Sequence, residues 1–365
     1  MQTATSIGKL NLRYIKDKMY HRHVYIEQLY GKAVVNYITS HLNLEDPGVQ
    51  IYNTNEPLNI KMNYASSLYG YVNLKEVNEI DNLNNFFEMV NENLPPGGYY
   101  IGCVQTNKSR RRKIFDEKSA ILAYPLYCFD FLVKRLLPKL NIFRFVSEKL
   151  PCNPGRAMSC TETLGRLVSC GFEVIDHREI GYRTYFVCKK SGRPSYNGHK
   201  KYGMIIGLER VGKNGNIINV LKLRTMHPYA EYLQEYVSNA NGLLYGDKVK
   251  DDFRVTSLGR LLRKYWLDEQ PMWVNFFRGD IKLVGVRPLS QAKLSIYPKD
   301  LQARRKNYKP GLIPPYYAEL PKTDEEFFAC EEKYMDQYDN QPTLTDLRYF
   351  FGVLFNIFFR GVRSS

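Results

Sequence analysis

Residues 252–271 read DFRVTSLGRLLRKYWLDEQP, and they place a helix pattern directly before two adjacent acids. Apolar residues recur at 258, 261, 262 and 265, which is helical spacing, and Ser257 is suited to cap the first turn. The opposite flank of this helix is basic, with Arg260, Arg263 and Lys264. The stretch therefore predicts a basic amphipathic helix that ends shortly before Asp268 and Glu269.

Asp268 and Glu269 allow two interpretations. Acids just before Pro271 and the apolar run 272–277 are typical of an ordinary helix start, and this structural interpretation is favoured when the pair is taken alone. A carboxylate at a helix N-terminus among arginines also has its anionic form favoured, and it can then attack a substrate or bind a metal ion. The functional interpretation requires Asp268 to be exposed and surrounded by cations.

Two flanking segments carry further cations. Apolar runs at 204–208 and 217–223 flank an Asn-Gly pair, which predicts a β-hairpin. Lys222 and Arg224 leave the second strand on one face, so they could meet one polyphosphate or form an ordinary surface pair. Further on, a Gly-Val-Arg-Pro turn follows a short strand-like run and would aim Arg287 outward, which is a moderate signal for anion binding.

Six segments occur in one order from about Glu209 to Gly361: ERVGKNG, KLRTM, DFRVTSLGRLLR, LDEQP, RGDIKLVGVRPL and KPGL. This ordered set closely resembles the bacterial sugar transferase family, also called monotopic phosphoglycosyl transferases. Members of that family start the synthesis of envelope polysaccharides, including exopolysaccharides, and of glycoconjugates. The resemblance implies a domain of helices mixed with short strands over residues 209–365.

The resemblance also implies a reaction, namely transfer of a phosphosugar from a UDP-sugar to polyprenyl (undecaprenyl) phosphate through an aspartyl-phosphosugar intermediate. Asp268 would attack the β-phosphate and release UMP, while Glu269 would help to place Mg²⁺. Phosphate binding is implied for Lys222, Arg224 and Arg287, and a supporting role for Arg254, Arg260 and Pro288.

The sequence departs from the family in three places, and in one of them Gly285-Val286-Arg287-Pro288 replaces the commoner Gly-Pro-Arg-Pro but keeps the arginine. Members usually carry an apolar re-entrant membrane helix before the ERVG segment, but here a polar linker, predicted over 191–208, takes that position. After KPGL, Ile313–Tyr317 replaces the usual Thr-Gly. The family pattern therefore does not predict which residues form the sugar and acceptor pocket. A non-catalytic docking or regulatory partner of a glycan-assembly transferase is therefore the alternative function.

Membrane attachment is predicted to be peripheral or monotopic. No window offers roughly 18 uncharged apolar residues, the length needed to span a bilayer. Two shorter apolar stretches, Ala120–Val133 and Tyr349–Phe359, have cationic flanks and suit either a core helix or a helix lying in anionic headgroups. With no signal peptide at the start, we expect a location at the cytoplasmic face of the bacterial inner membrane.

The N-terminal half, residues 1–190, reads as a separate α/β domain. Helical spacing is expected over Gly70–Leu94 and a helix over Thr161–Ser169, and buried strands are expected at 99–104, 172–175 and 184–188. The segments LPPGGYYIG and LVSCGFEVI resemble the distal part of a class I methyltransferase. Residues 1–64 contain no G-x-G turn for a cofactor, so we expect a degenerate Rossmann-like domain and keep active methyl transfer only as a minor alternative.

The net charge and the cysteine content limit the classes of partner and the cellular compartment that the sequence predicts. The formal net charge of +15 favours an acidic partner, and the absence of a nucleic-acid recognition motif favours anionic lipid or a phosphate-rich substrate over nucleic acid. Seven cysteines without a C-x-x-C pair indicate neither a zinc site nor a disulfide framework, which suits a reducing cytoplasm. The expected partners are thus the UDP-sugar, the polyprenyl phosphate and an anionic membrane surface.

Overall fold

A computed structural model describes residues 22–61, 68–131, 157–195, 202–241, 243–244, 248–249 and 252–363. The chain divides into two compact units. The first, here called the N-terminal unit, comprises Met1–His199 together with Pro228–Tyr236, and the second, the C-terminal unit, comprises Lys200–His227 and Val237–Ser365.

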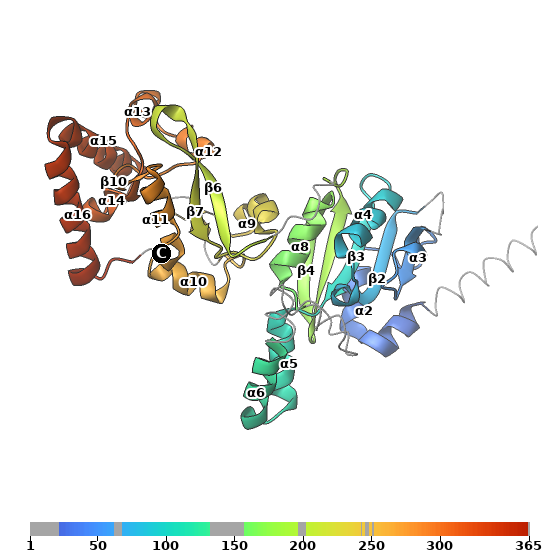
Figure 1. Ribbon diagram of the computed structural model, residues 1–365. Helices are drawn as coiled ribbons and strands as arrows, with labels where there is room; N and C mark the ends of the chain where they lie inside the picture. Colours follow the sequence, from blue (N-terminus) through green and yellow to red (C-terminus); the bar gives the residue numbers. More distant parts are fainter. Residues whose placement is uncertain are drawn as a thin grey trace, which may run out of the picture. The chain divides into compact units, whose positions relative to one another are not determined.

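The N-terminal unit contains a five-stranded sheet in the order β1-β2-β3-β5-β4 (Figure 1). Its strands are β1 (Val49–Tyr52), β2 (Gly70–Glu76), β3 (Tyr99–Val104), β4 (Phe172–Ile180) and β5 (Arg183–Lys190). The first three pair in parallel, and β5 runs antiparallel to both of its neighbours. Strand β4 therefore runs in the same direction as β3, and the tight β4–β5 connection inserts one reversed strand between them.

Helices connect these strands. They are α2 (Lys32–Thr39), α3 (Leu58–Lys61), α4 (Leu83–Asn93), α5 (Asn107–Glu117), α6 (Ala120–Phe131) and α8 (Cys160–Ser169), with the short 3-10 helices η1 (Val77–Glu79) and η5 (Ala230–Leu233). Period-two alternation along β3 and β5 separates two apolar layers. Ile101 and Val187 pack with α2, while Tyr100 and Phe186 join an aromatic cluster on the other side, with ring centroids 5.6 Å apart.

The expected strands of the N-terminal unit are confirmed, and the mixture of helix and strand agrees with the predicted α/β class. The predicted helical stretch Gly70–Leu94 is wrong in its first part. Gly70–Glu76 forms a buried parallel strand, and α4 begins only at Leu83, after an Asn82 cap. The apolar run 70–74 is equally compatible with a central strand, and pairing on both sides decided between them. The Rossmann-like character of the unit stays a prediction.

The C-terminal unit is built on small sheets and short helices. The hairpin of β6 (Ile205–Val211) and β7 (Ile217–Leu223) turns at Asn214 and Gly215, whose φ values of 59° and 76° fit the predicted Asn-Gly turn. Strand β6 begins inside the range predicted as linker. The remaining strands are β8 (Leu243–Leu244), β9 (Lys248–Val249), β10 (Lys282–Val284) and β11 (Gly311–Ile313), and β10 pairs with β11 in parallel.

The helices of this unit follow the hairpin. They are α9 (Gln234–Asn241), which starts in the N-terminal unit, α10 (Ser257–Lys264), α11 (Met272–Arg278), α12 (Gln291–Leu294), α13 (Lys299–Arg305), α14 (Tyr316–Glu319), α15 (Asp324–Asn340) and α16 (Pro342–Phe359), with η4 (Lys213–Gly215) and η7 (Leu267–Glu269). The predicted cap of α10 is wrong by one residue. Thr256, not Ser257, accepts a hydrogen bond from the amide of Gly259.

Asn275 fixes α11 to the hairpin. Its side chain is fully buried, its Oδ1 accepts from the Leu221 amide at 2.9 Å, and its Nδ2 donates to the Asn219 carbonyl at 2.7 Å. A buried amide that pairs with strand backbone holds two elements in one register. The segment between α10 and α11, which carries the two acids, is thereby placed beside β7.

Within the described residues, no helix combines the length and the apolar character needed to cross a bilayer. The predicted apolar stretch Tyr349–Phe359 forms the second half of α16. Tyr349 and Val353 are buried in the core of the unit, while the phenylalanines on the other side are exposed: Phe351, Phe355, Phe358 and Phe359. This stretch thus has one core face and one solvent face.

Candidate active site

The two adjacent acids lie in η7, immediately after Trp266, whose φ of 55° is left-handed. The chain therefore turns sharply between α10 and η7. Asp268 is 8% exposed, so the prediction of an exposed carboxylate is wrong. Among the residues that the structure describes, Oδ1 of Asp268 has no hydrogen-bond partner. A buried carboxylate oxygen without a partner is costly, which marks this atom as one that a ligand would satisfy.

Glu269 is held by the hairpin. Nζ of Lys222, which leaves β7, lies 2.6 Å from Oε1 of Glu269. Both side chains are about three-quarters buried, with 25% and 22% of their surface exposed. The structure thus brings together three of the predicted site residues: Lys222, Asp268 and Glu269.

Burial raises the pKa of Asp268 above its ordinary value. The positive charges of Lys222 and Arg263 lower that pKa, and the negative charge of Glu269 raises it further. The expected direction, in which the helix start and its arginines favour the anion, is therefore wrong. The carboxyl group loses more hydration than the neighbouring cations compensate.

Arg263, which the sequence pattern places only on the basic flank of its helix, interacts electrostatically with Asp268. Its Nε donates to Oγ1 of Thr225 at 2.9 Å, and burial lowers its pKa while Asp268 and Asp252 raise it. Gly259, one helical turn earlier, allows this approach, because a Cβ there would lie 2.1 Å from the Thr225 carbonyl oxygen. The signal in the sequence was the glycine one turn before the arginine.

The predicted supporting arginines occupy different environments. Arg254 is 3% exposed and pairs with Asp252, with Nη2 and Oδ2 2.8 Å apart. Its carbonyl accepts from the His227 amide, so it ties the segment before α10 to the chain that follows β7. Arg260 is exposed on α10. Arg254 is thus a structural support next to the site, and the role of Arg260 stays a prediction.

Arg224 contacts a different part of the chain from the acids. Its Nε donates to the Gly203 carbonyl at 2.9 Å, and its guanidinium lies 4.8 Å from the centre of the Tyr202 ring. These contacts direct it toward the segment before β6. Its predicted place in the phosphate clamp stays a prediction.

Arg287 lies beside the segment that replaces the usual Thr-Gly. Its side chain is exposed, with Pro288 following it, and its guanidinium lies 5.6 Å from the centre of the Tyr316 ring. Tyr316, then Tyr317 and Glu269, raise the pKa of Arg287 above its ordinary value. Glu269 is therefore within electrostatic reach of Arg287.

Tyr317 connects the same segment to the turn before the acids. The ring centroids of Trp266 and Tyr317 lie 5.6 Å apart in an edge-to-face arrangement, and those of Tyr316 and Tyr317 lie 4.4 Å apart. The departure at 313–317 thus supplies an aromatic wall next to the site. The sequence does not predict this wall, because the aromatic residues after KPGL match no family pattern.

The acids fit a divalent cation that is shared with a substrate. Magnesium is usually held by one or two carboxylates together with substrate phosphates, not by a complete protein cage. Within the described part of the chain, no cluster of three or more His, Cys, Asp or Glu residues could hold a metal ion. Glu269, whose Oε1 lies 2.6 Å from Nζ of Lys222, would supply the protein carboxylate of such a sparse donor set, which leaves Oδ1 of Asp268 free.

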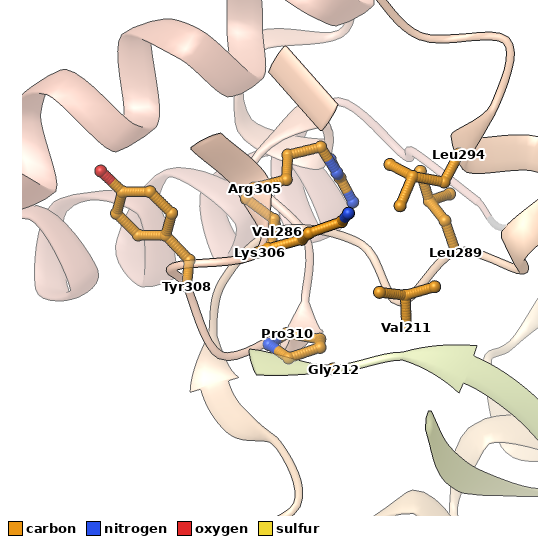
Figure 2. Close-up of a pocket in the computed structure, with 9 residues that line it drawn as sticks. All are labelled: Val211, Gly212, Val286, Leu289, Leu294, Arg305, Lys306, Tyr308 and Pro310. Atoms are coloured by element: carbon orange, nitrogen blue, oxygen red, sulfur yellow. The ribbon is translucent and has the colours of Figure 1, made fainter. Parts of the chain in front are cut away.

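Figure 2 shows a separate small pocket in the C-terminal unit, between the β6–β7 hairpin and the segment around Arg305. Its walls include Val211, Val286 and Leu289, and the residues predicted for the site do not line it. The Arg305 guanidinium pairs with Glu331 and donates to the Arg287 carbonyl at 2.6 Å. This pocket is therefore part of the framework that holds the segment carrying Arg287.

Comparison with known proteins gives matches in the C-terminal half. A family described as "Bacterial sugar transferase" matches residues 198–360. The chain is 36% identical over 111 residues to "Galactosyl transferase CpsE" of Streptococcus agalactiae, covering 30% of this chain and 24% of that protein. It is 34% identical over 122 residues to "Undecaprenyl-phosphate galactose phosphotransferase" of Salmonella typhimurium, covering 32% and 24%.

A third relative is "UDP-glucose:undecaprenyl-phosphate glucose-1-phosphate transferase" of Caulobacter vibrioides, 36% identical over 105 residues, which is 28% of this chain and 36% of that protein. In all three matches the aligned region spans well under half of the relative.

Proposed function

Residues 198–360 belong to the bacterial sugar transferase family, and from this premise we propose that they transfer a phosphosugar from a UDP-sugar to polyprenyl phosphate. The observation that carries the proposal is the buried, unpartnered Oδ1 of Asp268 beside the Lys222–Glu269 pair. A carboxylate that attacks a phosphate needs one oxygen free of hydrogen bonds, and cations that meet the developing charge.

The first step forms an acyl phosphate. An oxygen of Asp268 attacks the β-phosphorus of the UDP-sugar, and the bond from that phosphorus to the bridging oxygen breaks, so that UMP leaves. Lys222 and Arg287 would offset the negative charge that develops on the phosphate oxygens. Mg²⁺, when bound near Glu269, would add Lewis-acid stabilisation of the same oxygens.

The second step restores the enzyme. A phosphate oxygen of the polyprenyl phosphate attacks the same phosphorus, the bond to Asp268 breaks, and the carboxylate is regenerated with a polyprenyl diphosphosugar as product. Aspartate suits this route because a carboxylate is both a nucleophile and a leaving group once it is phosphorylated.

The acceptor requires a bilayer nearby. In the C-terminal unit, large apolar side chains on α10 and α11 are exposed close in sequence to the acids, among them Leu258, Leu261 and Phe277, which is 81% exposed. Apolar side chains next to basic ones suit a face that lies in lipid headgroups. We therefore include an anionic membrane, at the cytoplasmic face of the inner membrane, among the partners.

The test is UMP release from a panel of UDP-sugars with Mg²⁺ and undecaprenyl phosphate, using detergent-solubilised full-length protein. Asp268→Asn should lose activity by about 10³-fold or more, because the amide cannot act as the nucleophile. The exposed Asp300→Asn on α13 is the matched control and should keep full activity.

Two outcomes contradict the proposal. Undiminished turnover by Asp268→Asn would exclude the covalent route. Absence of UMP release with every donor would instead favour the alternative of a docking or regulatory partner. A sugar-phosphate adduct trapped on the wild-type protein without acceptor, and missing from Asp268→Asn, would establish the intermediate directly.

A further inference from the structure

Helices α5 and α6 form a hairpin that projects from the sheet of the N-terminal unit (Figure 1). The two helices contact each other along one narrow face of α6. Ala123 is fully buried there, and Arg110 makes a two-fold ion pair with Asp130, with distances of 2.7 and 2.8 Å. Phe115 packs against Tyr124 with ring centroids 4.9 Å apart. The hairpin is therefore a defined structure and not a loose extension.

The rest of α6 is apolar and exposed. Ile121 is 86% exposed and Phe129 is 67% exposed. The other large exposed apolar residues of this helix are Leu122, Tyr124 and Leu126. A helix that is apolar on nearly all sides is ordinarily buried in protein or in lipid, and soluble proteins seldom expose such a surface without using it.

The neighbouring helix supplies positive charge. Residues 107–130 contain six Lys and Arg residues against three Asp and Glu residues. Lys108, Arg111, Arg112 and Lys118 are exposed, and the Arg111 guanidinium lies 5.4 Å from the centre of the Phe115 ring. Cations beside exposed aromatic and aliphatic side chains are the combination that binds the headgroup region of an anionic bilayer.

We propose that the α5–α6 hairpin inserts shallowly into an anionic phospholipid surface and attaches the N-terminal unit to it. The described part of α6 has 12 residues, fewer than the roughly 20 needed to span the hydrocarbon core, and we place this part in the interface. This attachment goes beyond the proposed function, because it involves none of the residues of the C-terminal unit. It provides a membrane contact on a part of the chain that the sugar transferase match does not cover.

Cys128 provides a local probe of the hairpin, because it is exposed on α6 while Cys103, Cys170, Cys188 and Cys330 are buried and Cys160 is half-buried. Protein with Cys152→Ser and Cys160→Ser, labelled at Cys128 with an environment-sensitive fluorophore, is mixed with vesicles of phosphatidylcholine with or without phosphatidylglycerol. We expect a blue shift and quenching by lipid-borne quenchers with the anionic vesicles only. High salt should weaken both signals.

Variants separate the contribution of the apolar side chains to membrane binding from the contribution of the cations. Ile121→Glu combined with Phe129→Glu should weaken binding of the labelled hairpin by about tenfold or more, since two apolar side chains that would enter the lipid are lost. Lys108→Glu and Lys118→Glu should weaken it by about fivefold for each cation removed. Leu58→Glu on α3 changes an equally exposed apolar side chain of the same unit and should have no effect.

Two results would overturn the inference. A fluorophore that does not respond to anionic vesicles would show that this surface serves a protein partner or none. An unchanged response in the Ile121→Glu, Phe129→Glu variant would show that the hairpin is not the contact. UMP release in detergent does not depend on vesicles, so failure of the hairpin and failure of the proposed reaction are distinguishable.

Discussion

The two units differ in what they bury. Every buried polar side chain described in the N-terminal unit is neutral, whereas the C-terminal unit buries four charged side chains: Arg254, Asp268, Arg305 and Glu331. The buried faces of the N-terminal unit are otherwise apolar and aromatic, as around Tyr100 and Phe186. Since burial of a charge is costly unless the charge is paired, each of the four buried charges of the C-terminal unit requires a partner or a ligand.

The buried charges of the C-terminal unit are of two kinds. Arg254 pairs with Asp252, and Arg305 pairs with Glu331 and donates to the Arg287 carbonyl, so Arg305 helps to position the segment that carries Arg287. Asp268 alone among the four has an oxygen that the described structure leaves without a partner. The following predictions test this division, in order of decreasing effect.

Removal of one charge from the Arg305–Glu331 pair should have the largest effect on stability. Glu331→Gln leaves Arg305 buried without its counter-charge, and we expect the C-terminal unit to lose about 3–5 kcal/mol. Denaturant unfolding followed by tryptophan fluorescence measures this unit selectively, because both tryptophans, Trp266 and Trp273, lie in it.

The exposed neighbour provides the control, and Glu332→Gln should leave the unfolding midpoint unchanged. Replacement of both partners by apolar residues should recover part of the loss, because no unpaired charge remains. Equal stability of Glu331→Gln and the wild-type protein would contradict a structural role for the pair.

Lys222→Met should lower kcat/KM for UMP release by about 10²-fold, the usual cost of losing one group that stabilises charge in a transition state. Because Lys222 lowers the pKa of Asp268, its removal raises that pKa further. The acid limb of the pH–rate profile, which reports ionisation of the nucleophile, should therefore move to higher pH. Lys213→Met on the exposed hairpin turn is the control and should change neither quantity.

The stability of the N-terminal unit, whose described buried polar side chains are all neutral, should depend on side-chain volume in its core and not on charge. In Gly102→Ala the new Cβ would lie 2.6 Å from Cζ of Phe186, so we expect a loss of about 1–3 kcal/mol through overpacking. Gly192→Ala, where the new methyl group meets open space, should be neutral. Far-UV circular dichroism should report the lower stability of the N-terminal unit. The tryptophan fluorescence of the C-terminal unit and UMP release should stay unchanged.

The smallest effect is a pH dependence of the same unit. Burial lowers the pKa of His177, whose Nδ1 lies 2.9 Å from the Tyr236 hydroxyl. The unfolded chain then takes up the proton first, so the stability of the N-terminal unit should fall as the pH drops below about 6.5. Thermal melts between pH 8 and about pH 5 measure this slope. His177→Gln should flatten it, and an unaltered slope would assign the dependence to other groups.

Local patterns predicted several elements well. The Asn-Gly pair predicted the β6–β7 turn, because its left-handed conformations suit those two residues, and the aromatic run at 99–104 predicted β3. The resemblance carried by six ordered segments predicted the family of residues 198–360. The turn and the strand depend on residues within a few positions of one another, and the family is recognised from the order of short segments. All three are therefore visible in the sequence.

The errors share one physical origin. The stretch 70–76 became a strand because partners on both sides pair with it, and the pKa of Asp268 rises because packing removes its water. Arg263 and the aromatic wall at Tyr316 and Tyr317 reach the acids only through the folded chain. Pairing, burial and contact between distant residues are therefore the quantities that sequence spacing does not contain.

The sequence alone determined the family of residues 198–360 and the set of carboxylates and cations that we propose for phosphoryl chemistry, since both are recognised by residue type and order. Only the tertiary structure decided that Lys222 meets Glu269, that Asp268 is buried with an unsatisfied oxygen, and that α6 is left exposed. The packing of segments far apart in the chain sets the hydration of Asp268 and its distance from the cations, and these decide its reactivity. The same packing leaves the apolar side chains of α6 exposed, which decides the affinity of that surface.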